Sequence, residues 1–483
     1  MKPRASSRRL LDSKKNNRLD CEAGIGAEAK RVRSRRFSFP TSAMTACPTI
    51  WFINRFFFPD HSATSQILSD LAFHLASQGR RVGIITSRGV YDDPAVELPA
   101  FETVRGVEIR RVGRSRFGRN NLAGRAVDYA GLYVAFAAAV GRYARKGDWI
   151  VAKTDPPLLS AAIAPVAQAK GLRLVNWLQD VYPEVALGLG LHALRPIAPL
   201  LKAARNYSLR IAECNVAIGE RMREHLLREG APPERTVVIP NWCDDEAIKP
   251  LSKEENPLRR QWGLMDKFVV GYSGNLGRAH EYDTLVGAAE ILRDEPNIVF
   301  LFIGGGALMP GLKAEVERRA LSHMFRFFPY QDASLLPQSL CVPDLHWISL
   351  RPEMEGLIVP SKFYGIAAAG RATVAVTEPL GEVGGLIENF GCGETVQPED
   401  SAVLATAIQR CTQKEALCEA MGRNARAMLD RTFSSSLCKK SWNDILTSPE
   451  IALHQLINCN APVSRRDVTV KENASNPNGI SLP

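Results

Sequence analysis

Short hydrophobic runs alternate with longer amphipathic stretches over most of the chain. In the first half the runs are TIWFINRFF, which begins at residue 49, and then VGIITS, VEIRRV, WIVAKT, LRLVNWL, CNVAIG and TVVIPN. The stretches between them have helical periodicity; one begins near Ser62, carries Ile67, Leu71 and Leu75 on one face, and ends at Gly79. Strands that alternate with helices predict right-handed crossovers and a parallel, doubly wound sheet.

The same alternation restarts after a polar, proline-bearing stretch at residues 243–267, which we interpret as a linker. The later runs are FVVGYSG, IVFLFIG, FRFFPY, DLHWISL, ATVAVT and GETVQ. The sequence therefore predicts an α/β protein with two Rossmann-like, doubly wound parallel-sheet domains, at residues 47–242 and 268–430, that face a central cleft. A closing helix is expected at residues 431–448 and a flexible tail at residues 449–483.

The positive charge of the chain is concentrated in its first residues. Residues 1–43 contain twelve Lys or Arg and four Asp or Glu, so they carry +8 of the net charge of +10. The remainder is close to neutral, which argues against a nucleic-acid-binding surface. We interpret residues 1–46 as a disordered basic extension; the alternative is that translation begins at Met44, just before the first expected strand.

Cysteine content and hydropathy indicate a cytoplasmic protein without a membrane span. The ten cysteines form no C-x-x-C pair and have no histidines at metal-binding spacing, as in proteins with reduced core thiols. No hydrophobic run reaches the roughly 20 residues that a transmembrane helix needs.

Two glycine-rich turns follow the first two expected strands of the second domain. The first turn consists of Gly274, Asn275, Leu276, Gly277 and Arg278, and the second is Gly304–Gly306. Ligands of parallel sheets bind beyond the carboxyl ends of the strands, and glycines let the backbone approach a phosphate closely. We interpret both turns as phosphate contacts; the alternative is that the glycines only satisfy the geometry of tight turns.

A lysine at the start of a helix provides a more specific signal. In EGLIVPSKFYGIAAAG, Pro360 can begin a helix, which leaves Ser361 and Lys362 in its first turn. The helix dipole favours negative charge at this position, so a bound anion would account for the lysine. The alternative is a solvated surface lysine.

Polar residues at the carboxyl ends of first-domain strands are candidates for contacts with a ligand. Asp60, His61 and Ser62 lie at the start of a helix whose first amides are free to bind a ligand. Asp180, with Glu184 nearby, follows the strand LRLVNWL, at the edge of the sheet where ligands bind. Asp180 is therefore a candidate general base; the alternative is an aspartate that caps a turn.

Six segments resemble a known family, the retaining GT-B glycosyltransferases of glycosyltransferase family 4. They are FFPDHSATSQILSDLAFHL, LQDVYPEVALGLG, IPNWCD, YSGNLGRAHEYDTL, LRPEMEGLIVPSKFYGIAAAGR and ENFGCGETV, and their order and spacing match over residues 48–440. More narrowly, this stretch is similar to the colanic-acid and N-acetylfucosamine transferases of bacterial surface-polysaccharide assembly. The expectation for the fold is therefore the GT-B arrangement of two Rossmann-like domains.

The resemblance implies how a nucleotide diphosphate sugar would be bound. The loop Gly274–Arg278 would face the donor diphosphate. Arg351 and Lys362, with Ser361 beside them, would neutralise its charge as the leaving group departs. Stabilisation of that charge is then the expected main contribution to catalysis.

The resemblance also implies contacts with the base and the sugar, with one departure. Phe328 and Tyr330 would flank the nucleobase, and Glu355 would contact the transferred sugar. The wider family has a second glutamate, which usually holds the ribose, where this chain has Gly365. Glu382 is the candidate to replace it.

The implied activity is transfer of a sugar, with retention, from a UDP- or GDP-sugar to a lipid-linked saccharide. It would need no metal or other cofactor, in keeping with the absence of an Asp-x-Asp manganese motif from the sequence. Asp180 would lie where an acceptor hydroxyl meets the donor, and the other residues on the acceptor side would be Asp60, His61, Ser62 and Glu184. The product would be a bacterial surface polysaccharide, and the enzyme would lie on the cytoplasmic face of the inner membrane. Two alternatives are a non-catalytic two-domain protein that binds a nucleotide sugar or polysaccharide, and a nucleotide-sugar epimerase on the same GT-B scaffold.

One segment of the first domain has the composition of a membrane-surface helix. Residues 192–211 carry hydrophobic Leu194, Ile197, Leu201 and Leu209 among basic Arg195, Lys202, Arg205 and Arg210. Basic amphipathic helices of this kind bind anionic bilayers. The alternative is a core helix with a solvated basic face.

Overall fold

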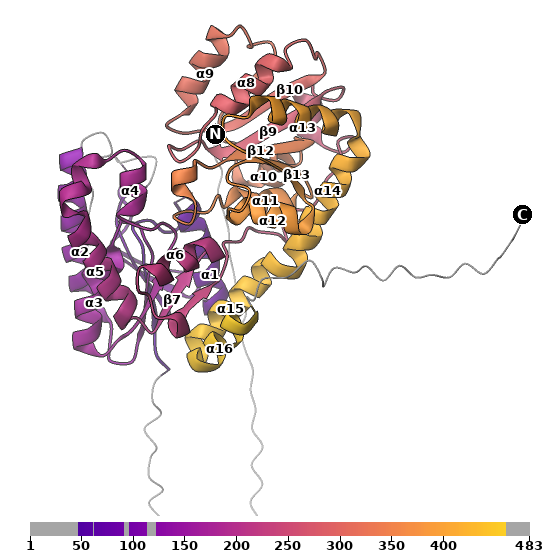
Figure 1. Ribbon diagram of the computed structural model, residues 1–483. Helices are drawn as coiled ribbons and strands as arrows, with labels where there is room; N and C mark the ends of the chain where they lie inside the picture. Colours follow the sequence, from indigo (N-terminus) through magenta and orange to yellow (C-terminus); the bar gives the residue numbers. More distant parts are fainter. Residues whose placement is uncertain (1–46, 61, 91–95, 114–121, 460–483) are drawn as a thin grey trace, which may run out of the picture. The chain divides into compact units, whose positions relative to one another are not determined.

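The computed structural model describes residues 47–60, 62–90, 96–113 and 122–459, and Figure 1 labels its helices and strands in chain order. The basic extension expected at residues 1–46, the candidate His61, and residues 460–483 of the expected tail lie outside the described residues.

The first domain contains an eight-stranded sheet in the order β3-β4-β2-β1-β5-β6-β7-β8. Its strands are β1 (Ile50–Ile53), β2 (Val82–Thr86), β3 (Phe101–Val104), β4 (Val107–Arg111), β5 (Trp149–Ala152), β6 (Arg173–Trp177), β7 (Cys214–Ala217) and β8 (Thr236–Val238). Its α-helices are α1 (Ala63–Ser77), α2 (Leu122–Tyr143), α3 (Leu159–Lys170), α4 (Glu184–Gly188), α5 (Ala198–Ile211) and α6 (Glu220–Arg228). All neighbouring strands are parallel except β3 and β4, and the order runs outward from β1 in both directions, as in doubly wound sheets.

The antiparallel β3–β4 hairpin adds a strand, β3, that is absent from the hydrophobic runs of the sequence. Its two-residue turn is formed by Arg105, with a φ of 50°, and Gly106, with a φ of 82°. Positive φ at both central residues is the requirement of the hairpin turn whose twist matches its strands. The Arg-Gly pair is a weak signal in the sequence, because arginine is not among the residues that favour this conformation.

The second domain contains a six-stranded, fully parallel sheet in the order β11-β10-β9-β12-β13-β14. Its strands are β9 (Phe268–Asn275), β10 (Ile298–Gly305), β11 (Phe325–Phe328), β12 (Leu345–Ser349), β13 (Ala372–Val376) and β14 (Gly393–Val396). Its α-helices are α8 (Asp283–Ile291), α9 (Met309–Arg318), α10 (Leu336–Leu340), α11 (Lys362–Ala368), α12 (Glu382–Phe390), α13 (Ser401–Gln413) and α14 (Glu415–Met428). The prediction of two doubly wound parallel sheets is confirmed.

The expected linker contains a short helix that belongs to the second domain. This helix is α7 (Pro257–Gln261), and Arg259 within it is fully buried. The Arg259 guanidinium donates to both carboxylate oxygens of Asp344, at 2.8 and 2.9 Å. This two-point pair attaches the end of the linker to the start of β12.

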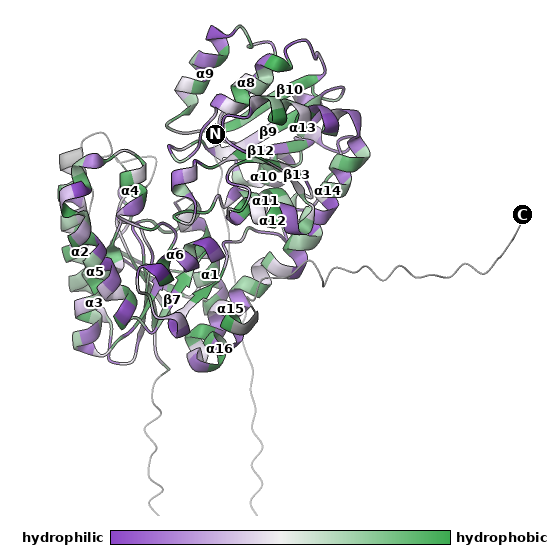
Figure 2. Cartoon of the chain, viewed as in Figure 1, coloured by the Kyte–Doolittle hydropathy of each residue, from purple (hydrophilic) through white to green (hydrophobic). Residues whose placement is uncertain are grey.

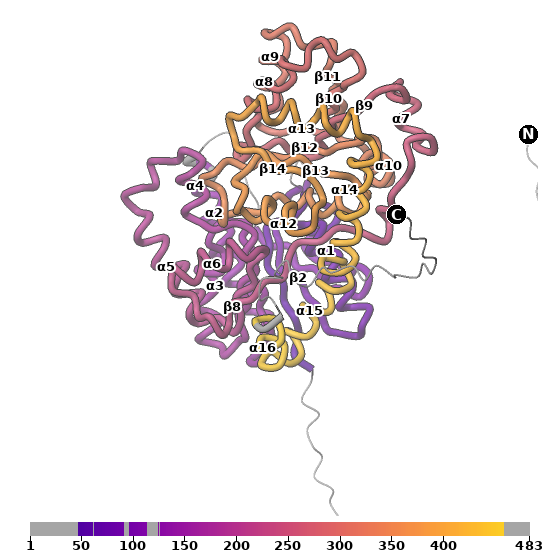
Figure 3. The backbone as a smooth tube through the Cα atoms, turned by 45° about the vertical axis from the view of Figure 1, so that its right-hand side comes forward, coloured from indigo at the N-terminus to yellow at the C-terminus, as the bar shows by residue number. Residues whose placement is uncertain are grey.

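The last helices return to the first domain. After a π-helical turn (Leu429–Phe433) come α15 (Ser435–Thr447) and α16 (Pro449–Cys459), which run beside first-domain segments in both views (Figures 1 and 3). The Arg80 guanidinium donates to Asn443 and Thr447 of α15, and the rings of Trp442 and Trp177 are 4.5 Å apart. The tail expected from residue 449 therefore begins with a packed helix, which buries Leu453.

Hydrophobic residues fill both faces of each sheet, and Figure 2 shows them concentrated in the strands. In the part of the chain that the structure describes, no helix combines the length and hydropathy needed to cross a bilayer.

Candidate active site

The carboxyl ends of β9 and β10 form two glycine turns, and the second of them leaves no room for side chains. Gly274 has a φ of 124° and Gly304 a φ of 123°, values that only glycine adopts readily. A Cβ atom on Gly304 would lie 2.4 Å from the carbonyl oxygen of Gly274. The structure therefore brings together the two turns that the sequence marks as phosphate contacts, at the edge where ligands of doubly wound sheets bind.

The two aromatic candidates differ in their surroundings. Tyr330 is 60% exposed, and its ring would lie 3.1 Å from a Cβ atom on Gly304, so it covers the second glycine turn. Phe328 instead stacks on Trp262, with ring centres 4.2 Å apart and an interplanar angle of 17°. Tyr330 is therefore the better placed of the two to stack on a planar ligand.

Lys362 begins α11, and its side chain lies against β9. Its Nζ is 2.9 Å from the Tyr272 hydroxyl and 3.1 Å from His280 Nε2, and it lies 4.7 Å from the centre of the Tyr272 ring. Its Cε would contact a Cβ atom on Gly274 at 3.6 Å, which places the amine beside the first glycine turn. Burial lowers the pKa of Lys362 to about 7, and no carboxylate of the described residues contributes to this shift.

Arg351, Arg278 and Ser361 are further donor-side candidates. Arg351 follows β12, donates its backbone N–H to Ala279 at 2.9 Å, and pairs with Glu353 at 2.9 Å. Their side chains are 35% and 53% exposed, so the pair contributes little stability and Arg351 is able to exchange Glu353 for a bound anion. Arg278 is exposed, and Ser361 precedes α11 without making a side-chain capping bond.

Glu355 and Glu382 each accept a hydrogen bond from the start of a helix. The Glu355 carboxylate accepts the backbone N–H of Glu382 at 2.6 Å, and the Glu382 carboxylate accepts the backbone N–H of Arg221 at 2.9 Å. Burial raises both pKa values, that of Glu382 to about 7.

At the position of the family's second glutamate, Gly365 is buried and a Cβ atom there would meet Leu340 at 3.4 Å. The Glu382 carboxylate contacts α6 of the first domain. Its proposed contact with a ribose stays a prediction.

A backbone hydrogen bond brings Asp180 next to the segment that carries Glu355. The N–H of Val181 donates to the carbonyl of Leu357 at 3.0 Å, so residues adjacent to both carboxylates are paired. Burial raises the pKa of Asp180 to about 6, and the charge of Asp155 acts in the same direction. A carboxylate that titrates near neutral pH is suited to accept a proton from an acceptor hydroxyl.

Lys153 is a functional candidate that the sequence analysis does not identify. It follows β5 with 1% exposure, donates to the Thr64 carbonyl of α1 at 2.9 Å, and lies 3.9 Å over the Trp177 ring. Burial lowers its pKa to about 7, against the opposing charges of Asp180 and Asp155. The signal in the sequence is a lysine at the carboxyl end of the buried run WIVAKT. A lysine is rarely buried in such a position unless it is paired.

The remaining first-domain candidates form the turn before α1. Asp60 is 4% exposed, and its carboxylate accepts both the backbone N–H and the hydroxyl of Ser62, at 2.8 and 2.5 Å. These bonds give Asp60 and Ser62 a role in shaping the turn. His61, between them, lies outside the described residues.

Glu184 is part of an ion network in the first domain, and we therefore assign it a structural role in place of the expected acceptor contact. Its carboxylate pairs with Arg205 at 2.7 Å and with Lys202 at 3.0 Å, and both cations also pair with Glu229. Burial acts to raise the pKa of Glu184, but its interactions with His225, Arg205 and Lys202, among them the charge of Arg205, outweigh it and lower that pKa to about 2.

The same network contains a grouping with metal-ligand chemistry. One ligand atom each from Glu184, His225 and Glu229 lie within 4.8 Å of one another. Arg205 and Lys202 already contact both carboxylates, so a cation would have to displace two positive charges. The donor set is therefore better described as an ion network than as a metal centre.

The basic segment at residues 192–211 does not form the expected surface helix. It divides into a 3₁₀ helix (His192–Ile197) and α5, and Arg205 is 3% exposed within the ion network. Lys202 is engaged by the same two carboxylates. Two of its basic residues thus have protein partners, which corrects the expectation that they face lipid; Arg195 and Arg210 are exposed.

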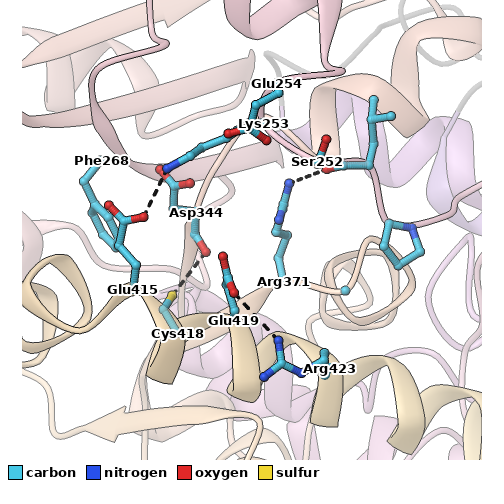
Figure 4. Close-up of a pocket in the computed structure, with 13 residues that line it drawn as sticks. Ser252, Lys253, Glu254, Phe268, Asp344, Arg371, Glu415, Cys418, Glu419 and Arg423 are labelled. Carbon is cyan, nitrogen blue, oxygen red and sulfur yellow. Dashed lines mark hydrogen bonds and ion pairs between the residues drawn. The ribbon is translucent and has the colours of Figure 1, made fainter.

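A cavity of about 290 Å³ lies at the opposite end of the second sheet from the glycine turns. It is lined by residues at the amino ends of strands, among them Phe268, Asp344 and Arg371. Figure 4 shows Lys253 reaching Glu415, at 3.1 Å, so charged groups of its lining pair with one another. Because ligands of parallel sheets bind at carboxyl ends, this cavity is not the donor site.

Comparisons with known proteins agree with this geometry. Residues 63–242 match the model of the glycosyl transferase 4-like domain, and residues 254–428 match that of glycosyl transferases group 1. The chain is 27% identical over 320 residues to the probable glycosyltransferase WbjE of Pseudomonas aeruginosa, covering 66% of this chain and 79% of that protein. It is 29% identical over 271 residues to the putative colanic acid biosynthesis glycosyl transferase WcaI of Escherichia coli K12, covering 55% and 66%.

Solved structures show the same fold. HepE from Anabaena, in complex with UDP and glucose, matches with a TM-score of 0.63 and 19% identity, over 83% of this chain and all of that one. Two successive glycosyltransferase domains on two doubly wound sheets distinguish an enzyme of this class from a binding protein on a similar scaffold. The chain belongs to the GT-B glycosyltransferases of glycosyltransferase family 4.

Proposed function

We propose that this enzyme transfers a sugar, with retention, from a UDP- or GDP-sugar to a lipid-linked saccharide during synthesis of a bacterial surface polysaccharide. The observation that carries the proposal is Lys362, whose partly buried amine has neutral hydrogen-bond partners beside the glycine turns of β9 and β10. When this amine carries its charge it needs a counter-ion, and a diphosphate that approaches the backbone at Gly274 would supply it.

Catalysis would come mainly from the charge that develops on the leaving diphosphate. That charge is larger in the transition state than in the bound donor, so Lys362 and Arg351 would stabilise the transition state more than the ground state. Asp180 is the candidate to receive the acceptor proton, and in the alternative the donor phosphate receives it. Neither route requires a metal or another cofactor.

The names of similar proteins support the substrate classes. HepE is described in complex with UDP and glucose, which favours a nucleotide sugar as donor. The E. coli relative is named for colanic acid biosynthesis, which favours a surface polysaccharide as product. The lipid-linked acceptor is the part of the proposal that rests on the resemblance to the family.

A membrane-bound acceptor requires a surface that meets lipid, and α2 offers one. Along one side of this helix, exposed small or apolar residues are Val127, Gly131, Val134, Ala138 and Gly141. Val127 and Val134 are 61% and 71% exposed, and the end of the helix carries exposed Arg142. An apolar stripe with a basic end suits the surface of an anionic bilayer. We propose α2, in place of residues 192–211, as the contact with the inner face of the membrane.

A panel of nucleotide sugars, incubated with lipid-linked acceptors, tests the proposed activity. Thermal shift first selects the donor, because a ligand that binds the native state raises the melting temperature. Lys362→Ala should then lower kcat by about 10²–10³, more than it weakens donor binding. Lys267→Ala, at the other end of β9, is the matched control, since the Lys267 amine donates to the Pro296 carbonyl, away from the glycine turns. Transfer by Lys362→Ala at the control rate would remove Lys362 from the mechanism.

A further inference from the structure

The Lys362 amine has two hydrogen-bond partners whose roles are fixed by their other contacts. Nδ1 of His280 lies against the carbonyl of Ser349, and a carbonyl only accepts, so Nδ1 carries the proton. The other ring nitrogen, Nε2, therefore has a lone pair, and it accepts from Lys362.

The hydrogen-bonding role of the Tyr272 hydroxyl is fixed in the same way, by its other contact. Its hydroxyl donates to the carbonyl of Asn275 at 2.7 Å, so its oxygen is left to accept from Lys362. A neutral amine has two N–H groups and one lone pair, which matches two acceptors. An ammonium has a third N–H, for which these two partners provide no acceptor.

We propose that His280 and Tyr272 are positioning residues that hold Lys362 as a neutral, two-donor amine in the free enzyme, and that a nucleoside diphosphate binds together with the proton that charges it. The third N–H of the ammonium would then be donated to a diphosphate oxygen. The inference rests on the proposed donor site and adds a proton to the binding reaction there.

The electrostatics of the site support this coupling. Burial lowers the pKa of Lys362 to about 7, and burial, followed by the charge of Lys362, lowers that of His280 to about 3. His280 therefore stays neutral over the working range, and burial raises the pKa of Tyr272, which keeps its proton. Among the described residues, these are the titratable groups that contact the amine, Tyr272 from β9 and His280 from the turn before α8. An adjacent diphosphate would raise the pKa of Lys362, so binding above pH 7 takes up a proton.

Calorimetry of UDP and GDP binding to the full chain measures this proton directly. The binding enthalpy is recorded at pH 8 in buffers of different ionisation enthalpy, and its slope gives the number of protons taken up. The terminal phosphate of the nucleotide, with a pKa of about 6, is already ionised at pH 8, so uptake there comes from the protein. We expect uptake approaching one proton for the wild type, with affinity falling by up to tenfold per pH unit above pH 7.

Variants assign the proton to Lys362. Lys362→Met should abolish the uptake at pH 8, whereas Lys267→Met should leave it unchanged. His280→Leu removes one acceptor and should weaken UDP binding about tenfold, and His280→Gln, which retains an acceptor, should restore part of it. A positioning role predicts this rescue together with an altered pH profile, which a purely structural role does not.

The outcomes separate this inference from the proposed function. UDP or GDP binding without proton uptake by the wild type overturns the inference and leaves the donor site standing, and this measurement needs no variant to fold. Uptake that persists in folded Lys362→Met also overturns it. Absence of binding by both nucleotides to an active enzyme overturns the donor class itself.

Discussion

The backbone N–H of Glu382 donates to the carboxylate of Glu355 at 2.6 Å, while the carboxylate of Glu382 accepts the N–H of Arg221 at 2.9 Å. Each carboxylate lies at a helix start whose preceding residue is a glycine. A Cβ atom on Gly381 or Gly219 would lie 2.5 Å from the Glu355 or Glu382 carboxylate, respectively. The missing side chains let carboxylates from other segments satisfy the free amides of α12 and α6, and the second contact joins the two domains.

Glu382→Gln should change how stability depends on pH. The folded pKa of Glu382, about 7, lies above its ordinary value of 4.5, so the native state binds a proton that the unfolded chain releases between these values. The wild type should therefore lose free energy of unfolding relative to the glutamine variant as pH rises from 4.5 through 7. Urea unfolding of both proteins at pH 5 and pH 8 measures the difference. Exposed Glu317→Gln on α9 is the control, and parallel wild-type and Glu382→Gln curves would contradict the prediction.

Lys153→Met should shift the pH profile of catalysis. The charge of Lys153 lowers the pKa of Asp180, against burial and Asp155, so its removal should raise that pKa further above 6. If Asp180 accepts the acceptor proton, the acid limb of kcat/KM moves to higher pH, and activity at pH 6.5 falls more than activity at pH 8.5.

Lys170→Met provides the comparison for Lys153→Met. Lys170 also donates to a backbone carbonyl, that of Ala144 at 2.7 Å, but lies at the end of α3, away from strand carboxyl ends. The pH profile of kcat/KM for Lys170→Met should match that of the wild type. An unchanged acid limb in folded Lys153→Met would show that Asp180 does not act as the base.

Arg205→Ala should destabilise the first domain by about 3–5 kcal/mol, because it removes a buried arginine and leaves partly buried Glu184 and Glu229 without the cation that lies nearest to them. Arg195→Ala, from the exposed 3₁₀ helix of the same segment, should change the free energy of unfolding by no more than about 0.5 kcal/mol. Denaturant unfolding compares the two. Equal effects would show that the network does not contribute to stability.

Val134→Glu should release the protein from anionic liposomes without loss of fold. The substitution puts a charge in the middle of the exposed stripe of α2, where it opposes both insertion and the negative surface. Val403→Glu, at a valine that is 48% exposed on α13, is the matched control and should still bind. Flotation with acidic vesicles is the measurement, and wild-type protein that stays in solution would exclude the proposed lipid contact.

The architecture could be predicted from the local sequence pattern. The same holds for the edge of the second sheet at which the donor is expected to bind. Strand periodicity and helical periodicity are local, so runs such as IVFLFIG predict parallel strands without knowledge of their neighbours. The glycines at 274 and 304 are also local signals, because their φ values require the absence of a side chain. Lys362 stood out because its position in a first helical turn opposes the dipole.

Only the three-dimensional arrangement shows which charged side chains are available to a ligand and which pair with other groups of the protein. Arg205 belongs to a basic pattern in the sequence, yet it is buried against Glu184 and Glu229, more than twenty residues away on either side. Glu382 and Arg221 are separated by 161 positions, and His280 and Lys362 by 82. Contacts between residues so far apart in the sequence depend on how separate strands and crossovers are brought to one edge of a sheet. A local pattern of hydrophobic and polar residues does not contain that information.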